Sequence, residues 1–239
     1  DADRAAGTLS PEHLAAALRR LREAGYVAFE SLIPQELTRE LRDAFQVIHE
    51  EEFRDRKSDA GWNRRGGRGA RFEHPFMHPL MIENPIGMQV MEAAMGDDLW
   101  GMLPYHTNTS FPGAREQGVH RDTPHLFPEL THALPPAMLI LHVPLIDFTE
   151  ENGSTELWPG THLITDVDPH TGERLDMAER ARDMPSVRTN IPAGSLVVRD
   201  MPWIPRPPRS SSMGGPKAAG PAEGLPLTRA RAFVTGTTK

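Results

Sequence analysis

The sequence predicts an α+β protein in which helices come first and short antiparallel strands follow as a jelly roll or barrel. Before residue 100, apolar residues recur at the three- and four-residue spacing of amphipathic helices. From Trp100 onward, short β-type runs alternate with turns rich in Pro, Gly and Asn. A length of 239 residues fits one large domain, or at most two small ones.

Two helices are expected near the N-terminus, on either side of a short strand. Ser10 is a suitable N-cap and Pro11 a suitable first residue for a helix that ends near Gly25. After a strand candidate at 26–31, Pro34 opens the second helix. Its apolar side is expected to face the core and consists of Leu37, Leu41, Phe45 and Ile48.

A glycine- and arginine-rich stretch separates these helices from a third one. Residues 58–71 contain four glycines and four arginines, which is typical of a flexible surface loop. The functional alternative is a lid whose arginines meet an anionic substrate. The third helix is expected after Asn84-Pro85 and ends at Gly96.

The expected strands are short and are separated by turns. The strongest is 137–146, where alternate side chains, including His142, share one face. Asn152-Gly153 is a turn, because this pair tolerates positive φ. The other strand candidates are 101–106, 107–111, 154–158, 187–191 and 195–199, with a last strand around Arg229 and Arg231.

Composition restricts the chemistry and the partners. The chain has no cysteine, so any metal must be bound by His, Asp, Glu or water, which favours iron, manganese or zinc. A formal net charge of −7 argues against general nucleic-acid binding. No apolar run approaches the roughly 20 residues of a membrane span, and the first residues lack an apolar signal core. We therefore expect a cytoplasmic protein without membrane or nucleic-acid partners.

The stretch with the clearest chemical content is His120-Arg121-Asp122. On a β-strand, side chains two residues apart project from the same face, so His120 and Asp122 could bind one metal ion while Arg121 points away. With a second His they would form the facial triad of non-haem Fe(II) oxygenases. A surface turn with an ion pair is the alternative. A kinase catalytic loop fails, because no glycine-rich phosphate loop or Asp-Phe-Gly accompanies it.

Three stretches together resemble one family. EQGVHRDTPH at 116–125, EENGSTELWPGTH at 150–162 and PAGSLVVRDM at 192–201 are similar to motifs of the phytanoyl-CoA dioxygenase family. The resemblance covers about residues 10–201 and implies a cupin-like double-stranded β-helix in a single domain over 1–201. It also implies an Fe(II)/2-oxoglutarate-dependent dioxygenase, which uses dioxygen to hydroxylate or otherwise oxidise a small organic substrate.

The resemblance also implies roles for particular residues. His120 and Asp122 would be the metal-binding and catalytic residues, and Gln117 and Thr155 match positions that often face the co-substrate or metal pocket. Pocket and purely structural roles both remain open for a further group: Thr107, Asn108, Thr109, His125, His142 and His162.

The chain departs from the family pattern near its end. The second iron-binding His should follow the 194–200 strand, but no histidine occurs after His170. The segment 202–239 is rich in Pro, Gly and Arg and has Glu223 as its only acidic residue. An altered coding end, natural divergence, or a substitute ligand could each explain this. The substitute candidates are His142, His162, His170 or a second carboxylate.

An arginine is also expected to hold the distal carboxylate of 2-oxoglutarate. Arg229 and Arg231, in the expected last strand, are the candidates, with Arg206 and Arg209 as alternatives. The sequence therefore predicts a 2-oxoglutarate-dependent dioxygenase that is impaired because a metal ligand is missing. A non-catalytic ligand-binding β-barrel is the alternative, and a zinc hydrolase using His120, Asp122 and a third His is a further one. Substrate identity and oligomeric state are not predicted.

Overall fold

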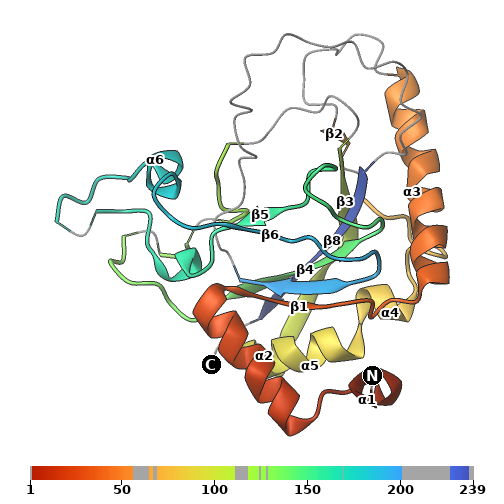
Figure 1. The fold of residues 1–239 in the computed structure, drawn as a ribbon, viewed down its shortest axis with the longest axis horizontal. Coiled ribbons are helices and arrows are strands. Elements are labelled where there is room, and N and C mark those ends of the chain that lie inside the picture. Colours follow the sequence, from red (N-terminus) through yellow and green to blue (C-terminus); the bar gives the residue numbers. More distant parts are fainter. Residues whose placement is uncertain are drawn as a thin grey trace.

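The structure is a computed structural model that describes residues 2–55, 65–66, 69–110, 118–123, 125–127, 129–168, 170–200 and 227–236. Its main feature is a six-stranded antiparallel sheet in the order β1-β7-β4-β8-β3-β2. Helices cover one face of this sheet, and a two-stranded sheet, β5-β6, lies toward the other face (Figure 1). The predicted α+β class with antiparallel strands is confirmed.

The helices lie where capping residues place them. Ser10 accepts a hydrogen bond from the His13 backbone N–H, and Gly25 ends the same helix at a φ of 79°. Asn84 caps the third long helix by accepting from the Gly87 N–H at 3.1 Å. The helices are α1 Ala2–Ala6, α2 Pro11–Ala24, α3 Gln35–Asp55, α4 Pro79–Ile82, α5 Pro85–Met95, the 3-10 turn η1 Thr161–Leu163 and α6 Met177–Ala181.

The strands are mostly shorter than the sequence predicts. The expected strands at 154–158 and 187–191 form only two paired residues each, in β5 and β6. The strand bounds are β1 Tyr26–Phe29, β2 Arg65–Gly66, β3 Leu99–Ser110, β4 Met138–Pro144, β5 Glu156–Leu157, β6 Val187–Arg188, β7 Leu196–Arg199 and β8 Leu227–Gly236.

Two predictions about the strands need correction. The expected separate strands 101–106 and 107–111 form one strand, β3, with a register shift between Met102 and His106. Pro104 lies within this shift, and a proline cannot donate a ladder hydrogen bond. Within the expected loop at 58–71, Arg65 and Gly66 pair with the end of β3.

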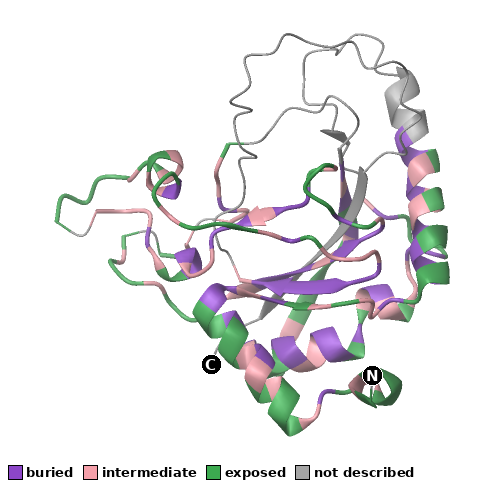
Figure 2. Ribbon diagram, viewed as in Figure 1, coloured by how far each residue is buried: buried purple, intermediate pink, exposed green. Residues whose placement is uncertain are grey.

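The core lies between the helices and the main sheet. Leu41 and Phe45, on the predicted apolar side of α3, are fully buried there. From the sheet, Leu139 and Leu141 of β4 and Val198 of β7 belong to the same apolar cluster. The purple segments in Figure 2 follow this interface. Alternation along the strands then turns the intervening residues of β4 and β7 toward the opposite face.

The last strand also matches the expectation from sequence. β8 runs between β3 and β4 and pairs with both. Within the described part of the chain, no helix is both long and apolar enough to cross a membrane.

Candidate metal centre and pocket

The segment 118–123 brings His120 and Asp122 together, although not on the strand that the sequence predicts. Among these residues only His120 takes part in a bridge, and the others are bends or irregular backbone. The two side chains nevertheless approach, with 3.7 Å between His120 Nε2 and Asp122 Oδ1. The Asp122 side chain is buried at 6% exposure, whereas His120 keeps 35%. The pair therefore forms through a fixed loop conformation and not through strand alternation.

Arg121 fixes that conformation. Its side chain is buried and donates from Nε to both carboxylate oxygens of Asp166, at 3.1 and 2.9 Å. Its Nη2 donates to the Thr161 carbonyl at 2.7 Å. Burial lowers the pKa of the guanidinium, while the Asp166 carboxylate opposes that shift. Because Arg121 is held on the side of η1, its two neighbours are directed to the other side.

A hydrogen bond orients the His120 ring. Its Nδ1 lies 2.8 Å from the Gly118 carbonyl oxygen, which can only accept, so Nδ1 carries the proton. In the neutral ring, Nε2 then presents a lone pair toward Asp122. A backbone carbonyl is one of the usual partners of the second ring nitrogen of a metal-binding histidine, beside carboxylates and water.

A buried arginine meets Asp122 from the main sheet. Arg199 on β7 is 2% exposed, and its Nη2 donates to Asp122 Oδ2. The same nitrogen lies 3.0 Å from Nε2 of His142 on β4. His142 pairs with Val197 in the sheet register, so Arg199 lies two residues further along on the same face. Strand register therefore brings His142 and Arg199 together, and Arg199 in turn contacts Asp122.

A small pocket, partly open to solvent, lies beside this cluster. His142 and Arg199 contribute its polar wall from the main sheet, and Thr155 and Thr189 contribute hydroxyl groups from the side of β5 and β6. The rest of the wall is apolar: Pro144, Phe148, Leu157, Ile191 and Val197. The role of Thr155 toward a co-substrate stays a prediction.

Two of the pocket candidates on β3 face elsewhere. The hydroxyl groups of Thr107 and Thr109 lie 3.1 and 2.7 Å from Nε2 of His49, on helix α3. Both threonines are buried on that side of the sheet. Asn108, which alternates with them, is partly exposed.

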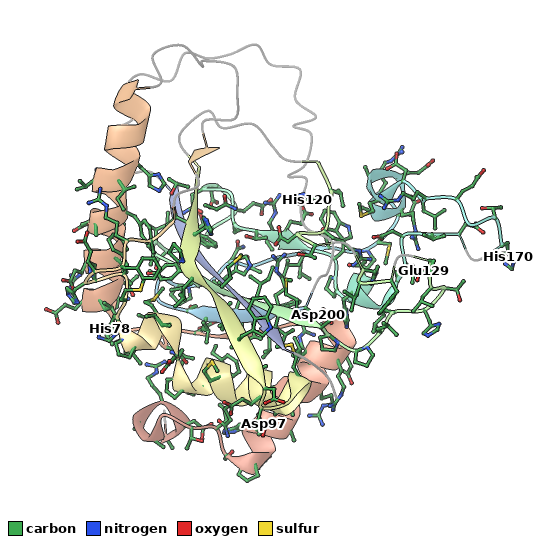
Figure 3. All side chains as sticks on the ribbon, turned by 180° about the vertical axis from the view of Figure 1, so that it is seen from behind. His78, Asp97, His120, Glu129, His170 and Asp200 are labelled. Carbon is green, nitrogen blue, oxygen red and sulfur yellow. The ribbon has the colours of Figure 1, made fainter. Side chains whose placement is uncertain are left out.

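Two other substitute-ligand candidates, His162 and His170, and the pocket candidate His125 have their contacts or positions elsewhere. His162 donates from Nε2 to the Arg22 carbonyl at 3.0 Å, and its burial lowers the pKa of the ring. His125 lies 3.0 Å from the Ile164 carbonyl in the same way. His170 is exposed at the periphery of the molecule, far from His120 (Figure 3). Among the candidate histidines, His142 is the one that contacts Arg199, the partner of Asp122.

For Arg229 and Arg231 the structure describes the strand pairing of the backbone. The predicted site residues that remain lie outside the described residues. Arg231 on β8 is paired directly opposite His142, and Arg229 opposite Pro144. Gln117, Arg206 and Arg209 lie outside the described residues.

The donor set does not fit a three-ligand iron centre. Across the described ranges, no group of three His, Cys, Asp or Glu residues could hold a metal ion. His120 and Asp122 supply two donors, and the second carboxylate oxygen of Asp122 accepts from Arg199. Open catalytic metal sites normally use three protein ligands.

Sequence reasoning missed Arg199. The available signal was an arginine at an inward position of the apolar run Leu196–Arg199, where alternation places it beside Val197 on the pocket face.

The overall fold is similar to that of several solved structures, among them a non-haem α-ketoglutarate-dependent epimerase. The epimerase SnoN from nogalamycin biosynthesis is 17% identical, with a TM-score of 0.62 over 95% of this chain and 82% of SnoN. AviO1 from Streptomyces viridochromogenes Tue57 is 21% identical, with a TM-score of 0.63 over 97% and 99%. EctD from S. alaskensis is 17% identical, with a TM-score of 0.60 over 95% and 77%. At these identities the likeness concerns the fold.

The sequence itself identifies the family. The family model described as phytanoyl-CoA dioxygenase (PhyH) matches residues 21–201. The chain belongs to this family, so the resemblance seen in its motifs is confirmed.

Proposed function

We propose that this chain is a 2-oxoglutarate-dependent dioxygenase that acts on a small organic molecule and whose iron centre is impaired. Family membership supports the reaction class. Related folds support the ligands: SnoN was solved with Fe³⁺, α-ketoglutarate and nogalamycin RO, and EctD with 2-oxoglutarate and 5-hydroxyectoine. The two antiparallel sheets on either side of the pocket are consistent with the expected cupin-like jelly roll.

The ion pair between Asp122 and Arg199 carries the proposal of impairment. A metal ion must displace a buried guanidinium from this carboxylate, and separating a buried pair leaves an uncompensated charge at a cost of several kcal/mol. The family's later histidine is also missing, since none follows His170. Two donors and a competing internal cation together predict feeble iron binding.

The pocket supports a small substrate. Its apolar wall and few polar groups are typical of sites that bind small organic molecules. We assign the pocket to a single domain over residues 1–201. Strand β8, which lies in the divergent segment 202–239, completes the main sheet of this domain. We also propose that the protein is cytoplasmic.

A non-catalytic ligand-binding protein is the second candidate. The same ion pair favours it, because Arg199 neutralises Asp122 without a metal while the pocket remains. A zinc hydrolase gains no support, because the described residues supply no third ligand beside His120 and Asp122.

Anaerobic titration of the full chain with Fe(II) and 2-oxoglutarate tests this proposal. The expected result is a weak visible charge-transfer band that appears only when Fe(II) far exceeds the protein concentration. Stoichiometric binding at micromolar protein would contradict impairment. If the band is absent throughout while calorimetry detects 2-oxoglutarate binding, the non-catalytic alternative is supported instead.

A further inference from the structure

We propose that Trp100 and Met102 on β3 form an apolar platform that holds a flat, largely apolar ring of the substrate beside the His120–Asp122 pair. The inference rests on the proposed function, because it takes this pair as the reacting centre. It adds the chemical class of the substrate and the strand that receives it. The platform itself follows from strand register and exposure, which do not depend on the state of the metal centre.

Strand register places the platform on the same face of the main sheet as the pocket. Met102 is paired with Phe233 of β8, and Phe233 is paired with Ile140 of β4. Ile140 is paired in turn with Arg199 of β7, which lines the pocket and donates to Asp122. Paired residues of antiparallel strands project from the same face. Met102 therefore lies in the row of side chains that leads to Asp122.

Trp100 lies in the neighbouring row, where the loop after Asp122 contacts the sheet. It is paired with Thr235 of β8, which is paired with Met138 of β4. The hydroxyl group of Thr123, the residue that follows Asp122, lies 3.6 Å from the sulfur of Met138. Strands β3 and β4 are separated only by β8, which corresponds to about 10 Å at two strand spacings. A ligand of two fused rings on Trp100 can therefore extend toward this loop.

The platform is exposed although it is apolar. Trp100 is 59% exposed and Met102 is 44% exposed, whereas Ile140 on the same face is fully buried. Alternate residues of a strand share a face, so the two exposed side chains are neighbours, about 7 Å apart along β3. Neighbouring exposed apolar side chains are characteristic of binding surfaces, whereas isolated ones are common. A substrate on the pocket face would cover this exposed area.

The two side chains favour a flat ring over a bulky aliphatic group. The indole of Trp100 offers a rigid planar surface, and aromatic rings gain more from stacking on it than area burial alone provides. The Met102 thioether is flexible and polarizable and makes favourable contacts with the edges of aromatic rings. Beyond the register shift, the same face of β3 becomes polar at His106. The apolar section is therefore short and fits a ring system of about two fused rings.

A small molecule fits this surface better than a second copy of the chain does. The β5–β6 sheet lies toward the same face of the main sheet (Figure 1), and the loop of Thr123 contacts that face at Met138. A stable protein interface buries about 800 Å² on each partner. Because the inner face is shared with a loop and a second sheet, the platform has room for a ring but not for such an interface.

Methyl NMR of the unsubstituted full chain tests the inference, with 2-naphthol as the flat probe and decahydro-2-naphthol as its saturated counterpart. The ring current of 2-naphthol should shift the methyl resonance of Met102 most and that of Met138 less. The resonance of Met91, which is fully buried in the core on the helix side, should not move. Binding of the saturated probe as tight as that of 2-naphthol would overturn the flat-ring class. Absence of 2-naphthol binding, or binding without a shift at Met102, would overturn the platform.

Substitutions measure the contribution of the platform to binding. Trp100→Ala should weaken 2-naphthol binding roughly fivefold or more, because the stacking surface is lost. Trp100→Phe keeps a flat ring and should retain most of the affinity. Val47→Ala is the matched control: this side chain is 52% exposed but lies on α3, on the other side of the sheet, so the affinity should stay unchanged. Equal affinity of Trp100→Ala and the unsubstituted chain would overturn the inference.

The two proposals fail in different experiments. The 2-naphthol measurements need neither metal nor co-substrate, so their outcome does not depend on the Fe(II) titration. Tight Fe(II) binding would contradict the proposed impairment and leave the platform in place. Unchanged 2-naphthol binding by Trp100→Ala would overturn only the platform. A dimer in gel filtration that Trp100→Ala dissociates would also overturn it, because the surface would then belong to a second copy of the chain.

Discussion

Two buried arginines with different partners shape the site at the scale of single residues. Arg121 holds the loop by binding Asp166 and the η1 carbonyl of Thr161, while Arg199 neutralises Asp122. The first points away from the pocket and the second lines it. One arginine therefore determines where the His120–Asp122 pair lies, and the other determines how readily a cation can reach it.

Loss of the Arg121 contacts should destabilise the protein. We expect Arg121→Met to lower the free energy of unfolding by about 3 kcal/mol, because Asp166 and two backbone carbonyls lose a buried donor. Urea unfolding measures the change. Arg42→Met is the control: its ion pair with Asp43, which is 64% exposed, should contribute at most about 1 kcal/mol. Equal effects of the two substitutions would contradict the anchoring role of Arg121.

At the scale of elements, the end of helix α2 (Pro11–Ala24) is joined to the turn that contains η1. His162 donates to the carbonyl of Arg22, and the Gly160 N–H donates to the carbonyl of Ala24. A Cβ at Gly25 would lie 2.6 Å from the His162 ring. The Pro-Gly-Thr-His turn at 159–162 therefore positions η1. The carbonyl of Thr161, in η1, accepts the hydrogen bond from Arg121.

Gly25→Ala should disturb this junction beyond ordinary backbone strain. The φ of 79° alone costs a non-glycine residue about 1 kcal/mol or more, and contact with His162 adds to it. Gly153→Ala is a matched control, with a φ of 82° and nothing within 4 Å of the added Cβ. Thermal unfolding should show a clearly larger loss for Gly25→Ala. A loss no larger than that of Gly153→Ala would indicate that His162 moves aside without cost.

At the scale of the whole molecule, β8 joins the two parts of the main sheet. It pairs with β3 on one side and β4 on the other, although it lies beyond the residues matched by the family model. The strand that carries His142 therefore depends on a segment whose sequence departs from the family pattern. Paired strands in a sheet interior protect one another from edge-to-edge association.

Removal of the segment after residue 200 should therefore abolish a stable fold. We expect a chain of residues 1–200 to lose cooperative thermal unfolding and to associate, because β3 and β4 gain unpaired edges. Circular dichroism and gel filtration measure both effects. A chain of residues 1–236, which keeps β8, is the control and should behave like the full chain. A monomeric, cooperatively folded 1–200 chain would show that β8 is dispensable.

The sequence alone determined the local features and the family. Ser10 and Gly25 bound a helix because capping chemistry acts within a few residues, and the His120 motif with its companion stretches identified the phytanoyl-CoA dioxygenase family. Only the tertiary structure decided what meets Asp122. Arg199 is 77 residues away in the chain, and its contact with Asp122 depends on strand register and on the loop conformation that Arg121 fixes. Such contacts leave no periodic signal in the sequence, because they arise from the packing of separate elements.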